Sequence, residues 1–287
     1  MKSPPKLTHG GRFFYNFMSV WGKVDMFLYE LKLATKNKLI LLCLIIGVAL
    51  GIPGILSYRS DVTFITGSGA PEAVSCYQAW LYALSLGGAS LYKIIAPLLI
   101  IPNLDSFFVE RKNGYSNFVI TRSNYKAYFF SKLFSGIIVS GAILIVSLLS
   151  WLAVCIVMFP HNMPIDTYTY ISDEELRHFF VNGPIIYIAV VIALNFLFAA
   201  IFYSLGFGLS YFCKNRYIVM IIPFLIYLAL TMLASILNWA MLSPVSMVAP
   251  HDIVEIFWDG IIIKYIIGIS ISAIVVLYSF VKSSREA

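Results

Sequence analysis

The run Asp173-Glu174-Glu175-Leu176-Arg177-His178 comes closest in this sequence to a catalytic set of side chains. Paired glutamates near an arginine carry out proteolysis inside membranes, where the glutamates lie in a helix at membrane depth. Here the run lies in a polar segment between apolar stretches, and no histidine at membrane depth faces it. We therefore predict no catalytic residue, and instead a solvated acidic rim that would attract cationic molecules by long-range electrostatics.

Patterns that bind metals or nucleotides are also missing from the sequence. Cys43, Cys76, Cys155 and Cys213 form no CxxC pair and no cluster with histidine, so we expect no metal site. The sequence contains no GxxxxGK[ST] run, the loop that cradles the phosphates of ATP. We therefore expect no metal and no cofactor in this chain.

The segment from Phe107 to Gly136 has the most informative order of residues. Glu110 ends an apolar stretch and is followed by two basic residues, and Gly114 permits a turn. Residues 115–121 are expected to form a short helix across the membrane plane. Basic side chains then alternate with aromatic ones, which would hold the segment at the membrane interface while the charges face the cytosol. The basic side chains of this part are Arg111, Lys112, Arg122, Lys126 and Lys132.

The composition shows what kind of protein must position these side chains. Of the 287 residues 60% are hydrophobic and 12% are charged, and the mean hydropathy is +0.86. Soluble domains have about 45–50% apolar and about 25% charged residues. This excludes a soluble enzyme, a secreted disulfide scaffold and a disordered chain. We predict an all-α, polytopic membrane protein.

Six apolar stretches are long enough to cross a bilayer, which requires about 20 residues. Stretches of this length predict helices, because a membrane barrel would show short alternating segments instead. The predicted spans are 39–57, 86–108, 134–158, 185–212, 217–241 and 260–281.

The distribution of Lys and Arg predicts the orientation. With the N-terminus in the cytoplasm, only Arg59 and Arg177 of the 20 basic residues fall in external segments, and Lys93 and Lys264 fall in the outer parts of spans. The remaining 16 are cytoplasmic, which places both termini inside a multi-pass cell-membrane protein. The net charge of +6 therefore reflects topology and not a nucleic-acid partner. Lys93 and Lys264 are expected to reach the interface with their ammonium groups.

Residues 1–38 form a cytoplasmic N-terminal segment, and residues 39–287 form the six-span domain with a cytoplasmic segment at 109–133. Apolar side chains recur in the N-terminal segment at intervals of three and four, which predicts an amphipathic helix. Glu30 and Lys32 fall away from this stripe. The helix would rest in the membrane interface or pack on another protein surface. The stripe comprises Phe13, Phe17, Trp21, Val24, Leu28 and Leu31.

The order of residues after Glu110, the six spans and the amphipathic N-terminal helix together resemble the membrane subunits of six-span, type-2 ABC exporters. The resemblance implies that two permease subunits pair, as a homodimer or a heterodimer. Each would seat its short cytoplasmic helix on a separate ATPase subunit, which binds the ATP and Mg²⁺. Glu110 would pair with Arg111 or Arg122 at the membrane edge. The residues expected to couple to the ATPase are Glu110, Arg111, Tyr115, Phe118, Arg122 and Lys126, with a secondary contact at Lys214 and Arg216.

In the resembled family the transport path runs between the two subunits, along their second and fifth spans. This makes Asn103, Thr231 and Asn238 candidates for the path, although polar groups in spans more often join helices. The expected cargo is amphipathic: an antimicrobial peptide such as a bacteriocin, a lipid or a drug. A membrane sensor or scaffold that docks a cytoplasmic partner through the basic loop remains the alternative.

Overall fold

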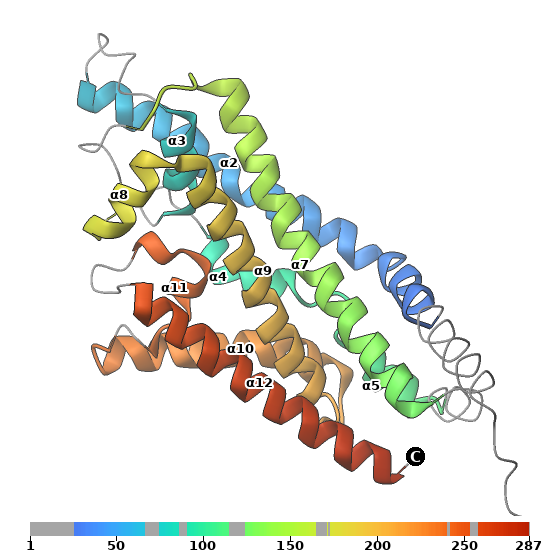
Figure 1. Ribbon diagram of the computed structural model, residues 1–287. Coiled ribbons are helices and arrows are strands. Elements are labelled where there is room, and N and C mark those ends of the chain that lie inside the picture. The colour runs from blue at the N-terminus through green and yellow to red at the C-terminus, as the bar shows by residue number, and fades with distance from the viewer. Residues whose placement is uncertain are drawn as a thin grey trace, which may run out of the picture.

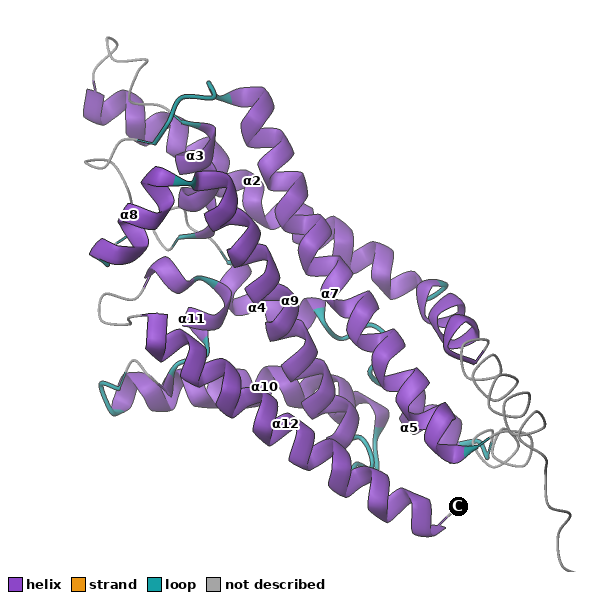
Figure 2. Cartoon of the chain, in the orientation of Figure 1, coloured by secondary structure: helices purple, strands orange, loops and turns teal. Residues whose placement is uncertain are grey.

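The computed structural model describes residues 26–66, 75–85, 91–114, 124–164, 171, 173–239, 242–252 and 258–286. Every regular element in these parts is a helix (Figure 2). Within them, five helices are long and apolar enough to cross a membrane. The chain is thus a polytopic α-helical membrane protein, as the composition predicts. These helices are α2 (Lys38–Thr66), α7 (Tyr125–Met158), α9 (Pro184–Leu209), α10 (Arg216–Ile236) and α12 (Trp258–Glu286).

Shorter helices lie between the long ones, and they define the two ends of the molecule. We call the α5 end the one where α5, the starts of α2, α7 and α10, and the C-terminus lie (Figure 1). The opposite end, with α8 and α11, is the α8 end. The short helices are α3 (Cys76–Leu84), α4 (Tyr92–Leu99), α5 (Ser106–Lys112), α8 (Glu174–Asn182), α11 (Val245–Val248) and the 3-10 helix η6 (Pro250–Asp252).

The predicted second span, 86–108, is wrong as a single helix. Its described part consists of α4 and α5, with a turn between Leu99 and Ser106. Pro102 lies in this turn, and Asn103 has a φ of 70°, a left-handed conformation that ends a helix. The prediction failed because an apolar run gives the length of a crossing but not the continuity of its backbone.

The bounds of the other spans also differ from the prediction. α7 begins at Tyr125, well before the predicted residue 134, and has 34 residues. At 1.5 Å per residue it is about 51 Å long, whereas the hydrocarbon core of a bilayer is about 30 Å thick. α7 is therefore longer than the apolar layer, and its two lysines, Lys126 and Lys132, both lie in its N-terminal part. α2 continues to Thr66, and α10 already ends at Ile236.

α9 is the central helix, and α7, α10 and α12 all pack against it (Figure 1). Small residues allow this close approach. A Cβ atom at Gly136 of α7 would overlap the Tyr203 ring of α9, and one at Gly208 of α9 would lie 2.8 Å from Val275 Cγ1 of α12. Asn195 of α9 accepts a hydrogen bond from Tyr92 Oη of α4 (3.2 Å) and donates one to the Val248 carbonyl (3.0 Å). Polar and small side chains thus join the helices around α9.

Candidate functional site

A buried charge cluster joins three elements at the α5 end. The Lys132 ammonium of α7 donates to Glu110 Oε1 of α5 and lies 3.3 Å from Glu30 Oε2, in the helix 26–35 that precedes α2. Tyr128 Oη donates to Glu110 Oε2 at 2.5 Å. We call these four residues, Glu30, Glu110, Tyr128 and Lys132, the charge cluster.

Helix geometry places the donors of the charge cluster. Tyr128 and Lys132 are four residues apart on α7, so they lie on the same face. Glu110 belongs to the last turn of α5, which faces them. The two helices border residues 115–123, which lie outside the described part of the chain. The charge cluster therefore ties both flanks of the predicted cytoplasmic segment to each other.

The electrostatics of the charge cluster are those of two carboxylates that share one buried ammonium. Lys132 is 3% exposed and Glu30 is 4% exposed. Burial raises the pKa of Glu30, while the charge of Lys132 opposes the shift and that of Glu110 adds to it. Removal of one partner from a buried ion pair leaves an uncompensated charge, which typically costs about 3–5 kcal/mol. Loss of the shared ammonium of Lys132 should therefore destabilise the packing of the three elements.

A second set of contacts connects α5 with the other half of the bundle. Arg111 Nη2 donates to the Tyr211 carbonyl (2.9 Å), and its guanidinium lies 4.4 Å from the centre of the Tyr211 ring. Lys282 of α12 lies 5.5 Å from the same ring. Arg216, at the start of α10, pairs with Asp105 at 3.1 Å. α5 is therefore connected to the end of α9, to α10 and, through Tyr211, to α12.

Aromatic rings fill the space between these polar contacts. Phe107 of α5 packs against Phe129 of α7 and Phe207 of α9, with ring centroids 5.5 and 4.9 Å apart. Phe280 of α12 lies 5.2 Å from Phe129. Side chains of α5, α7, α9 and α12 thus form one apolar cluster. A displacement of α5 would therefore change the packing of the other three helices.

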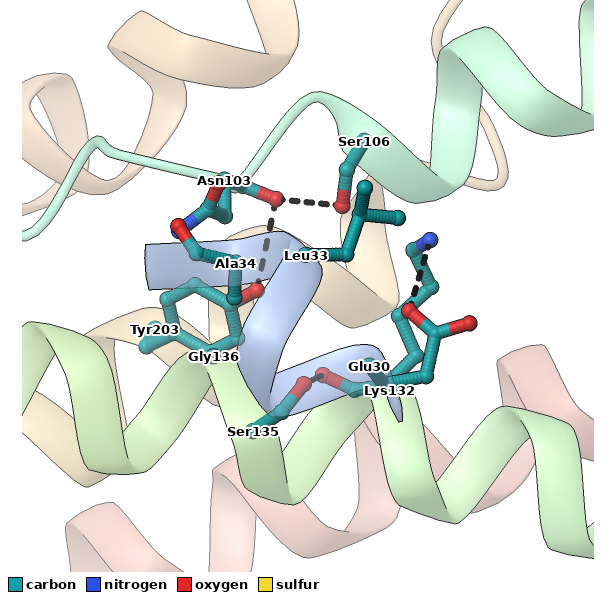
Figure 3. Close-up of a pocket in the computed structure, with 9 residues that line it drawn as sticks. All are labelled: Glu30, Leu33, Ala34, Asn103, Ser106, Lys132, Ser135, Gly136 and Tyr203. Atoms are coloured by element: carbon teal, nitrogen blue, oxygen red, sulfur yellow. Dashed lines mark hydrogen bonds and ion pairs between the residues drawn. The ribbon is translucent and has the colours of Figure 1, made fainter. Parts of the chain in front are cut away.

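Asn103 joins the helix break to the helix 26–35 and to α9, beside the charge cluster (Figure 3). Its Nδ2 donates to the Ala34 carbonyl (3.1 Å), and its carbonyl accepts from Ser106 Oγ (2.7 Å) and Tyr203 Oη (3.4 Å). A cavity of about 30 Å³ lies between Asn103, Glu30 and Lys132. This is the size of one water molecule, not of a transported substrate. The arrangement therefore suits a mechanical link better than a binding site.

The structure places only part of the predicted coupling residues. Glu110 and Arg111 are central to the contacts above, whereas Lys126 is exposed in the first turn of α7. Tyr115, Phe118 and Arg122 lie outside the described residues. The predicted pairing of Glu110 with Arg111 is wrong, because Glu110 bonds Lys132 and Tyr128 while Arg111 bonds Tyr211.

Two further expectations about charges at this end are wrong. Glu30 lies away from the predicted apolar stripe and is expected to be solvated, but it is buried. Lys132 is expected to face the cytosol and is also buried. Their mutual attraction offsets the loss of hydration. Phe13, Phe17, Trp21 and Val24 lie outside the described residues, so the interfacial helix remains a prediction.

Glu30, Tyr128 and Lys132 are thus the site residues that sequence reasoning missed. Glu30 and Lys132 are 102 positions apart, and no local pattern relates them. The one available signal was the combination of a carboxylate and an ammonium in apolar helical surroundings, where each needs a partner.

The remaining predicted residues are not brought together. Lys214 is exposed, and Arg216 pairs with Asp105. Thr231 donates to the Tyr227 carbonyl of its own helix (2.8 Å), and Asn238 is exposed beyond the end of α10 with a φ of 48°. These residues and Asn103 therefore form no common surface in this single chain.

The ionisable groups of the α8 end have structural contacts. Asp173 accepts from Leu176 N (2.9 Å) and so caps α8, whose first turn holds Glu174 and Glu175 where the helix dipole favours negative charge. Lys93 and Lys264 are both buried among protein atoms, and that their ammonium groups reach the level of the interface stays a prediction. Among the described residues, no group of three or more His, Cys, Asp or Glu is arranged to hold a metal ion.

No family model, curated protein or solved structure matches the chain. What the protein does must therefore be inferred from its own residues and their geometry.

Proposed function

We propose that the chain is the permease subunit of an ATP-driven ABC transporter of the cell membrane, energised by a separate ATPase subunit that binds ATP and Mg²⁺. Two permease subunits, identical or different, would form the path. The sequence supports the separate ATPase, because it contains no phosphate-binding loop.

The observation that carries the proposal is the charge cluster. It joins α5 and α7, which flank residues 115–123, to the helix 26–35. A partner that pushes on the segment between α5 and α7 would therefore move both helices and the N-terminal helix together. Membrane orientation depends on exposed Lys and Arg residues in the loop. It does not require a buried ion pair between the two helices that flank the loop.

The arrangement of the chain ends supports the proposed topology. The helix 26–35 leads into the start of α2 at the α5 end, and the C-terminus lies at the same end (Figure 1). We count the broken segment α4–α5 as a further crossing beside the five continuous helices, which would give an even number. Both termini would then lie in the cytoplasm, as the distribution of Lys and Arg predicts.

The expected cargo is amphipathic and exported, with a cationic antimicrobial peptide first and a lipid or drug next. The exposed Glu174 and Glu175 support a cationic cargo, because they add negative charge to the α8 end. Asn103, Thr231 and Asn238 stay candidates for the path only as parts of an assembly of two subunits.

Photo-crosslinking in native membranes tests the docking of an ATPase. A photoreactive amino acid in place of Phe118 should capture an ATPase with a phosphate-binding loop. The same group in place of His178, which is exposed at the α8 end, is the control and should not capture it. Capture of a kinase or another regulator at position 118 would favour the sensor or scaffold, and no capture of an ATPase would refute the transporter.

The coupling role of Glu110 is tested by ATPase activity in the reconstituted complex, with a cationic amphipathic peptide as the stimulant. In Glu110→Ala, Lys132 keeps Glu30 as its partner, so the complex should assemble. We expect most of the peptide stimulation to be lost while basal hydrolysis remains. Lys112→Ala changes an exposed residue of the same helix and should keep the stimulation. Unchanged stimulation in Glu110→Ala would contradict the coupling role.

A further inference from the structure

An apolar cavity of about 570 Å³ lies between α9, α10 and α12. α10 and α12 both pack against α9 but make few contacts with each other along their described lengths, so a space remains between them. α9 lines one wall with Ile201, Leu205 and Leu209. Pockets for small molecules in proteins measure about 300–1,000 Å³. The cavity is therefore large enough for a ligand.

The length of the cavity matches one leaflet of a bilayer. On α12 its lining extends from Ile263 to Val275. This is about 18 Å at 1.5 Å per residue, and one leaflet contributes about 15 Å to the hydrocarbon core. The cavity is thus a long apolar trough that runs along the helices and in the direction of the lipid chains.

One end of the trough is cationic. Lys264 is the one charged side chain among the described residues that line it. Its ammonium donates to the Ser243 carbonyl (3.1 Å) and to Ser246 Oγ, which hold it in place. Lys264 lies six residues after the start of α12, which is about 9 Å along the helix.

Trp239, at the same end of the cavity, indicates how deep Lys264 lies in the membrane. Trp239 follows α10, lines the cavity and is 57% exposed. Exposed tryptophans gather at the level of the lipid head groups. The cavity thus combines an apolar trough of one leaflet in length with a fixed cation near the head-group level.

We propose that this cavity is a binding site for an anionic phospholipid, with one acyl chain in the trough and the phosphate against Lys264. The match of charge and shape selects this occupant over a second copy of the chain, because a protein surface would have to fill a narrow apolar trough and also neutralise Lys264. The site is independent of the proposed transport function, and a chain that never binds an ATPase would still hold the lipid.

Quenching of Trp239 by brominated lipid tests the site in the full chain. The protein is reconstituted into nanodiscs of phosphatidylcholine that contain a small, fixed fraction of lipid with brominated acyl chains. The brominated lipid is phosphatidylglycerol in one arm and phosphatidylcholine in the other. Trp239→Phe identifies the signal of this indole. We expect several-fold stronger quenching of Trp239 by the anionic lipid, and equal quenching would refute the site.

Matched variants separate the head-group contact from the chain contact. Lys264→Gln should abolish the preference for the anionic lipid, and Lys264→Arg should keep it. Ile267→Phe with Ile271→Phe fills the trough and should weaken quenching by both lipids. Ile266→Phe with Ile274→Phe alters exposed positions of the same helix that lie outside the lining, and should have no effect.

The filling variants also keep the test valid if Lys264→Gln fails to fold, because their positions are partly exposed. A preference for the anionic lipid that survives both Lys264→Gln and the filled trough would overturn the assignment. A disulfide between two copies of Ile271→Cys, formed without any effect of lipid, would assign the cavity to a second chain instead.

Discussion

The charge cluster and the lipid cavity each contain a buried lysine, but the surroundings of the two ammonium groups differ. Lys132 is enclosed by two carboxylates and a tyrosine, and the cavity that it borders measures only about 30 Å³. Lys264 is bound by neutral serine oxygens and borders a space of about 570 Å³. The first arrangement is complete within the chain and suits the transmission of force. The second leaves room for a ligand and suits binding.

The loss of Lys132 is the largest effect we predict, because it leaves the buried Glu30 and the partly buried Glu110 without their cation. Lys132→Met should lower the free energy of unfolding by about 3–5 kcal/mol, measured by equilibrium unfolding in detergent micelles. Lys126→Met, an exposed change on the same helix, should stay within about 0.5 kcal/mol of the parent. A loss below about 1 kcal/mol in Lys132→Met would mean that the charge cluster does not hold the helices together.

The two regions should also differ in their tolerance of a single methyl group. Gly136→Ala places Cβ in the Tyr203 ring next to the charge cluster, and overpacking of this kind costs about 1–3 kcal/mol. In Gly268→Ala of the cavity, the nearest atom would be Ile201 Cδ1 at 3.1 Å, a side chain with open space beside it. This variant should unfold within about 0.5 kcal/mol of the parent protein. Equal losses would show that the contact of α7 with α9 at Gly136 and the wall of the cavity at Gly268 are equally tightly packed.

Acid should weaken the α8 end through His251 of η6, which is 1% exposed. Burial, and next the nearby charge of Lys93, lower the pKa of His251 to about 3, while the Leu81 backbone opposes the shift. Because the pKa of His251 is lower in the folded chain than its ordinary value of 6.5, its titration favours the folded chain above pH 6.5. This contribution to stability is lost as the pH falls toward the lowered pKa. The free energy of unfolding should therefore decrease as the pH falls below 6.5, by on the order of 1 kcal/mol per pH unit.

His251→Leu should remove this acid sensitivity, which thermal unfolding between pH 7 and pH 4 would show.

The stability of the α5 end should respond to pH with the opposite sign, because the pKa of Glu30 is raised by burial. Its contribution is present at low pH and is lost as the pH rises from 4.5 through the raised value. Glu30→Gln should flatten the curve on that side, and an unaltered curve would contradict the buried position of Glu30.

Lys264→Gln should have only a small effect on the free energy of unfolding. The variant loses hydrogen bonds to neutral oxygens but also avoids the burial of a charge, so the loss should be about 1 kcal/mol. The same unfolding measurement in detergent would show it. A loss as large as that of Lys132→Met would mean that Lys264 is part of the scaffold and not the head-group contact of a lipid site.

The sequence predicts the class of fold because apolar length and charge asymmetry are local properties. The five long helices follow from them, with errors at the ends. The early start of α7 was missed because Lys126 and Lys132 look like residues of an exposed loop, although they lie on a continuous helix. The break at Asn103 was missed because its left-handed backbone is supported by Ala34 and Tyr203, which are remote in the chain.

The candidate site was predicted in part for the same reason. Glu110 and Arg111 were found because they end an apolar run next to a turn. Their actual partners, Lys132 and Tyr211, are set by how α5 lies between α7 and α9. Such pairs depend on tertiary packing, and a single sequence does not contain a local pattern for them.

α7 is one uninterrupted helix, and it is gripped near both ends. At one end Tyr128 and Lys132 hold it, and at the other the Trp151 indole donates to the carbonyls of Gly47 (3.1 Å) and Val48 (3.0 Å) of α2. About 35 Å of helix separates Tyr128 from Trp151, and it contains no proline. Its Ser135-Gly136 and Ser140-Gly141 pairs are another type of site at which helices bend, but both glycines are packed against rings of α9, those of Tyr203 and Phe196. We therefore expect a tilt of α7 at Tyr128 to displace Trp151 as well. A single rigid helix would in this way transmit a movement from one end of the bundle to the other.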